Sequence, residues 1–124
     1  MVKQSVMEEQ ATYYYGDVEA LDELELARIR SEAERGYAKA QYALGLVLAR
    51  RDGVKHGDWA EAIKWYKLAA EAGYAAAQHE MGVLCALGTG MEKDAKVAVE
   101  WYHKAAVQGN AMSQFELARR IRLE

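Results

Sequence analysis

One ten-residue segment occurs three times in this chain, and it constrains the fold more than any other feature. The copies begin at Gly36, Gly73 and Gly109, and the second reads Gly-Tyr-Ala-Ala-Ala-Gln-His-Glu-Met-Gly. Their first residues are separated by 37 and 36 positions. Periods of roughly 20 to 50 residues are typical of solenoids, in which each repeat buries its apolar face against its neighbours. The spacing therefore predicts a stack of short repeats with a core that runs along the stack.

The residues inside each repeat favour helices. In the segment 38–51, Gln41, Leu44 and Leu48 lie on one face at helical spacing. The chain contains no proline, which breaks helix interiors. The glycine that opens each copy is expected to end the preceding helix, because glycine readily adopts the left-handed conformation found there. We therefore predict an all-α fold.

Two aspartates mark the expected starts of the second helix of each repeat. Asp94 stands directly before residues with helical spacing and is expected to cap them. Asp58 occupies the equivalent place one repeat earlier, and Glu61 three residues later completes a predicted capping box.

Small residues recur in the middle of the first helix of each repeat. Gly45, Gly82 and Ala118 are equivalent positions in the three copies. A glycine inside a helix costs about 1 kcal/mol relative to alanine, so it needs a packing reason. We expect a close approach by the aromatic pair of the second helix, Trp101-Tyr102 in the second repeat.

The repeats divide the chain into four parts of one continuous solenoid domain. We expect a degenerate helical N-terminal cap (residues 1–35), repeat 1 (36–72), repeat 2 (73–108) and a partial C-terminal repeat or cap (109–124). In the last part, Arg119 and Arg120 replace the apolar pair Val83-Leu84 of repeat 2. A terminal repeat requires such a polar outer face.

The composition excludes several classes of function. A net charge of −3 without a basic block argues against nucleic-acid binding. No apolar run is long enough to span a bilayer, so we expect no membrane insertion. Cys85 is the only cysteine, which excludes an intrachain disulfide and favours a reducing compartment. We expect the cytoplasm, or the periplasm if a signal peptide has been removed.

No motif predicts catalysis, a cofactor or a metal. His79-Glu80 begins like a zinc-binding helix, but Val83 stands where the second histidine ligand would be. Cys85 falls in an apolar packing column, where cysteines are inert. The loop Gly88-Thr89-Gly90 lacks the lysine and the later glycine of a phosphate-binding loop. We expect no catalytic, cofactor-binding or metal-binding residues.

The repeats resemble the Sel-one-like repeat family, a relative of the tetratricopeptide solenoids, over about residues 33–118. The second repeat carries the resemblance through Ala72-Gly73, Ala75, Ala77-Gln78, Met81-Gly82, Gly88, Gly90, Asp94, Ala98, Trp101-Tyr102 and Lys104-Ala105-Ala106. The resemblance implies a short right-handed α-solenoid of antiparallel helix pairs. It also implies a non-enzymatic scaffold or adaptor that binds other proteins, as in many bacterial members. With one cysteine, the chain departs from the disulfide-linked subset of the family.

A column of residues that differs between the copies is the candidate binding site. Tyr42, His79 and Phe115 are equivalent positions, and the residues four positions later complete the set: Leu46, Val83 and Arg119. By analogy with tetratricopeptide repeats, this flank faces a concave groove that binds a peptide or helix of a partner. The alternative is that the column packs between adjacent helices and belongs to the core. The sequence leaves both interpretations open.

The expected function is protein–protein interaction, as an adaptor or scaffold. One alternative is a dedicated inhibitor or immunity-type protein that blocks a toxin or enzyme, since residues 1–36 are acidic and could meet a basic target. Another is a structural protein that self-associates. We expect a monomer, with a weak dimer as the second option.

Overall fold

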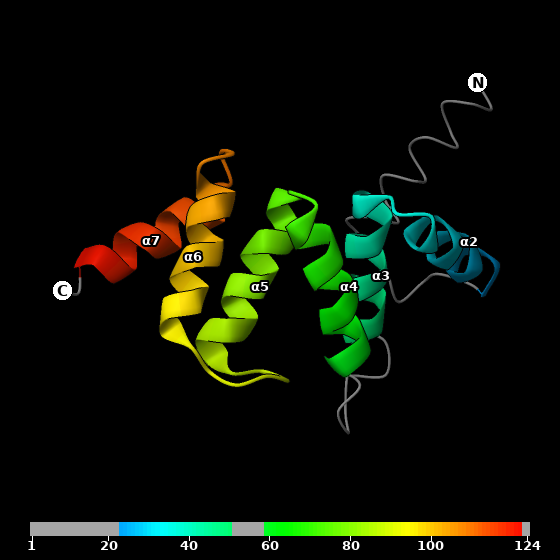
Figure 1. Cartoon of the computed structure of the whole chain (residues 1–124), viewed down its shortest axis with the longest axis horizontal. Coiled ribbons are helices and arrows are strands. Elements are labelled where there is room, and N and C mark those ends of the chain that lie inside the picture. Colours follow the sequence, from blue (N-terminus) through cyan, green and yellow to red (C-terminus); the bar gives the residue numbers. More distant parts are fainter. Residues whose placement is uncertain (1–22, 51–58, 123–124) are drawn as a thin grey trace. The chain divides into compact units, whose positions relative to one another are not determined.

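A computed structural model of the chain describes residues 23–50 and 59–122, with side chains described up to residue 120. These residues contain no strand, which confirms the all-α prediction for them. They form six helices (Figure 1): α2 (Glu23–Glu34), α3 (Ala38–Arg50), α4 (Trp59–Glu71), α5 (Ala75–Leu87), α6 (Ala95–Ala106) and α7 (Ala111–Arg122). Residues 1–22 of the predicted N-terminal cap and Asp58, the predicted cap of α4, lie outside the described residues.

The helices belong to two compact units. Unit 1 is Met1–Trp65 and unit 2 is Tyr66–Glu124, so the boundary lies within α4. In unit 1, α2 packs against α3 around the buried residues Ile29 and Ala33. The ion pair between Arg30 and Glu61, with 3.0 Å between Nη1 and Oε2, joins α2 to the first turn of α4.

The three repeated glycines end helices, as predicted. Gly36, Gly73 and Gly109 have φ angles of 97°, 98° and 95°, in the left-handed region that favours glycine. At each one, the N–H of the following residue donates to a carbonyl five residues earlier, as in Tyr74 N to Ala69 O at 3.0 Å. This Schellman geometry satisfies carbonyls that the helix end would leave unpaired.

The glutamine of each copy makes the same hydrogen bond. Its side-chain Nε2 donates to a main-chain carbonyl eight residues earlier, near the end of the preceding helix. The pairs are Gln41 with Ala33 (3.2 Å), Gln78 with Ala70 (3.1 Å) and Gln114 with Ala106 (3.1 Å). This column therefore belongs to the scaffold, where it fixes the start of one helix to the end of the previous one.

The core of unit 2 lies between α5 and α6, which run antiparallel in Figure 1. Tyr102, only 2% exposed, packs over Gly82. A Cβ atom added to Gly82 would lie 2.7 Å from the Tyr102 ring carbons Cδ1 and Cε1, which accounts for the mid-helix glycine. The predicted cap of α6 is confirmed, because the Asp94 carboxylate accepts the main-chain N–H groups of Lys96 and Val97 at 3.1 Å.

Candidate interaction surface

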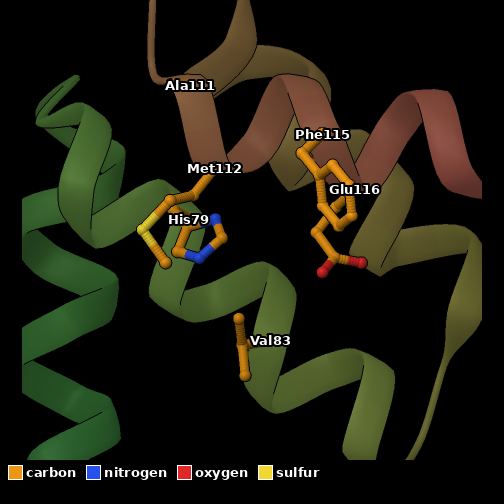
Figure 2. Close-up of a pocket in the computed structure, with 6 residues that line it drawn as sticks. All are labelled: His79, Val83, Ala111, Met112, Phe115 and Glu116. Carbon is orange, nitrogen blue, oxygen red and sulfur yellow. The ribbon is translucent and has the colours of Figure 1, made fainter.

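Unit 2 carries an open hollow of about 490 Å³ between α5 and α7. Most of its wall is apolar, and among the described residues the carboxylate of Glu116 is the one charged group in the wall. Figure 2 shows the lining side chains, which are His79 and Val83 from α5 and Ala111, Met112, Phe115 and Glu116 from α7.

His79 forms the buried part of the wall and connects the two helices. Its side chain is 7% exposed, and its Nδ1 shares a hydrogen bond of 2.8 Å with the Oγ of Ser113. Ser113 is completely buried and corresponds to alanines in the other two copies, Ala40 and Ala77. The centroid of the Tyr102 ring lies 5.6 Å from that of the imidazole. The small hydroxyl therefore allows α7 to approach α5 and supplies a polar partner for the imidazole.

The electrostatic environment of His79 favours the neutral ring. Burial lowers the pKa of His79 below its ordinary value near 6.5, because the imidazolium loses hydration. The Glu116 carboxylate opposes this effect and raises the pKa, but burial is the larger cause. The imidazole is thus uncharged at neutral pH.

This arrangement predicts a pH dependence of stability. Because the pKa of His79 is lower in the folded chain than in the unfolded chain, the unfolded chain binds the proton first as the pH falls. The free energy of unfolding should therefore decrease as the pH falls through 6.5 and level off below the folded-state pKa. Urea denaturation at several pH values between about 7.5 and 5.5 measures this slope.

One variant isolates the contribution of His79. His79→Gln cannot titrate and should have a flatter slope than the wild type. Equal slopes for His79→Gln and the wild type would contradict the prediction.

The rim of the hollow on α7 consists of large exposed side chains. Met112 is 65% exposed and Phe115 is 64% exposed.

Two arginines lie one turn further along α7. Arg119 Nη2 donates to Glu116 Oε1 at 2.8 Å. Arg120 lies closer to α6, with its guanidinium carbon 5.4 Å from the centroid of the Tyr102 ring and its Nε 3.7 Å from Glu116 Oε1. The two predicted outward-facing arginines thus differ, since Arg120 is half-buried against an aromatic ring.

The structure distributes the six predicted site residues over three environments. His79, Val83 and Phe115 line the hollow in unit 2. Arg119 is exposed beyond it. Tyr42 and Leu46 lie in unit 1, where Tyr42 is half-buried and Leu46, at 5% exposed, is buried.

Three further residues, which the sequence pattern did not indicate, line the hollow: Ala111, Met112 and Glu116. Met112 stands three residues before Phe115, which places the two on the same side of a helix. Glu116 directly follows Phe115. Spacing around α7 could have indicated Met112, but the hollow itself depends on how α7 crosses α5.

The described residues show no grouping for metal or thiol chemistry. No three histidine, cysteine, aspartate or glutamate side chains among them could together hold a metal ion. Cys85 is buried, its Sγ is 3.9 Å from the Met91 Sδ, and burial raises the pKa of its thiol. None of the helices in residues 23–50 and 59–122 is long and apolar enough to cross a membrane.

Comparison with known proteins identifies the repeat. The family model described as the Sel1 repeat matches residues 38–74 and 75–110. The crystal structure of a Sel1 repeat protein from Oxalobacter formigenes is similar at 37% sequence identity and a TM-score of 0.68, covering 76% of this chain and 70% of that one. No match was found among curated proteins.

A second solved structure belongs to a much longer protein. It is c5321, a protective antigen present in uropathogenic Escherichia coli strains and displaying an SLR fold. It is 35% identical with a TM-score of 0.68, and the match covers 74% of this chain but 20% of that one. These neighbours confirm the predicted class, an α-solenoid of antiparallel helix pairs. Sel1 repeat proteins generally act in protein interaction and are typically non-catalytic. The chain belongs to the Sel1 repeat family.

Proposed function

We propose that this chain is a non-enzymatic module that binds a segment of another protein in the hollow between α5 and α7. The observation that carries the proposal is the combination of an apolar hollow with two large exposed side chains at its rim, Met112 and Phe115. Isolated exposed hydrophobic residues are common on protein surfaces, but apolar side chains gathered around a concave site are typical of recognition surfaces.

The chemistry of the lining suits a protein segment. A phenylalanine ring and a methionine thioether offer a large contact area, and methionine adapts to partners of different shape. The other wall is held in place by the hydrogen bond between His79 and Ser113, so it is formed before the partner arrives. A preformed wall lowers the conformational cost of binding.

The test removes the rim without changing the core. A tagged chain and its Phe115→Gln/Met112→Gln variant are used to capture proteins from cell extract, and captured proteins are quantified by mass spectrometry. We expect specific partners to be reduced at least about tenfold in the variant, because anchors of this kind dominate interface energetics. Circular dichroism melts verify that the variant is folded.

A matched variant controls for the loss of exposed apolar surface. Leu87, the last residue of α5, is 68% exposed and does not line the hollow. Leu87→Gln should retain the wild-type partners. If the double variant also retains them all, binding does not use the hollow and the proposal is wrong.

A further inference from the structure

The hollow combines an apolar wall with one carboxylate, that of Glu116, and this combination indicates the chemistry of its partner. The inference rests on the proposed function. We propose that the hollow takes one apolar side chain of a partner segment and that Glu116 pairs with a lysine or arginine next to that side chain. The partner is thus a segment of another protein in which an apolar residue is flanked by a basic one.

The first argument is the orientation of the Glu116 carboxylate. In Figure 2 it extends from α7 into the space lined by His79 and Val83 of α5. Its ion pairs with Arg119 and Arg120 both use Oε1. The second oxygen, Oε2, therefore retains its capacity to accept a hydrogen bond from a cation that enters the hollow.

The second argument is the charge of the lining residues. Of the six, Glu116 carries the charge, and the other five are uncharged at neutral pH. Arg119 and Arg120, which pair with Glu116, are not among the lining residues. The hollow therefore has one carboxylate within an apolar wall.

The third argument concerns size. A volume of about 490 Å³ is within the usual range for sites that enclose a small ligand and exceeds the volume of one large side chain. An apolar side chain in contact with Val83 and Phe115 leaves room for the stem of a neighbouring lysine or arginine. Such stems pack along apolar surface while the charged group remains at the polar edge.

The experiment selects the partner chemistry directly. A random twelve-residue peptide library displayed on phage is selected on the purified full chain, with counter-selection on the Phe115→Gln/Met112→Gln variant. The peptides that remain are synthesised with a fluorescent label, and their Kd values are measured by fluorescence anisotropy. We expect an apolar residue adjacent to lysine or arginine in the selected peptides.

The role of Glu116 is then measured with two matched variants. Glu116→Gln keeps the shape and removes the charge, and we expect it to weaken binding about 5- to 30-fold, as loss of a charge-assisted contact does. Glu100→Gln removes an exposed glutamate on α6 outside the hollow and should change the Kd less than about twofold. Replacing the basic residue of the peptide by glutamine should remove the difference between wild type and Glu116→Gln.

Each remaining outcome overturns a defined part of the argument. Peptides that depend on Phe115 and Met112 but lack a basic residue, or bind Glu116→Gln as well as the wild type, would overturn the inference and leave the proposed function intact. No peptide sensitive to the rim variant would overturn both. If light scattering instead shows a dimer that the rim variant dissociates, the hollow binds a second copy and the inference is wrong.

Discussion

Gly82→Leu should destabilise the chain by about 3 kcal/mol or more, the upper end of the usual cost of overpacking. Even the first added atom, Cβ, would lie 2.7 Å from two carbons of the Tyr102 ring and 3.2 Å from a third. The ring is 2% exposed and has no solvent-facing position to which it can turn without opening the α5–α6 core. Denaturation in urea, followed by circular dichroism, measures the loss.

The chain contains a matched control for this prediction. Ala118 occupies the same position in α7 as Gly82 in α5, but it is exposed in the structure. Ala118→Leu should therefore change the free energy of unfolding by less than about 0.5 kcal/mol, as is usual for surface substitutions. If Gly82→Leu is equally neutral, close packing does not explain the small residues of this column.

The repeated features of the fold could be predicted because the same residue types occur at the same positions in all three copies. The glycines at the helix ends and the glutamines that bond to the preceding helix recur at constant spacing, and their function is local. The requirement for Gly82 could also be inferred, since a glycine within a helix contradicts its own propensity and needs a close neighbour. Tyr102 is that neighbour.

The hollow could not be predicted to the same extent. Tyr42, His79 and Phe115 share a position in the repeat, yet Tyr42 is half-buried, His79 is buried and Phe115 is 64% exposed. The sequence gives the direction of a side chain around its own helix, whereas exposure depends on what lies opposite. His79 has Ser113 of α7, the equivalent helix of the next copy, opposite it, and among the described residues no helix follows α7. Equivalent positions therefore have different surroundings, and only one copy combines an imidazole with a serine partner.

Arg120 also shows that the exposure of a side chain cannot be predicted from the sequence alone. Its substitution for an apolar residue of repeat 2 predicted a polar outer face, but its guanidinium lies over Tyr102 and its Nε atom is buried. An arginine can lie over an aromatic ring and remain only partly exposed, as Arg120 does, so charge in the sequence does not by itself indicate exposure.

Gln78→Leu should cost about 2 kcal/mol, because the substitution removes two hydrogen bonds from a buried position at about 1 kcal/mol each. In the structure, Gln78 Nε2 donates to the Ala70 carbonyl at 3.1 Å, and Gln78 Oε1 accepts from Gln108 Nε2 at 2.8 Å. Leucine has nearly the same volume, so the loss reports the hydrogen bonds more than the packing. The Ala70 carbonyl keeps its bond from the N–H of Gly73, which limits the cost.

The same bond in the next copy supplies the control. Gln114 donates to the Ala106 carbonyl at 3.1 Å, as Gln78 does to Ala70, but Gln114 is exposed whereas Gln78 is only 6% exposed. Water replaces the lost partner at an exposed site, so Gln114→Leu should cost less than about 0.5 kcal/mol. Urea denaturation of the two variants compares the two bonds of the buried Gln78 with the single bond of the exposed Gln114. Equal losses would mean that neither burial nor the additional bond to Gln108 increases the contribution of Gln78 to stability.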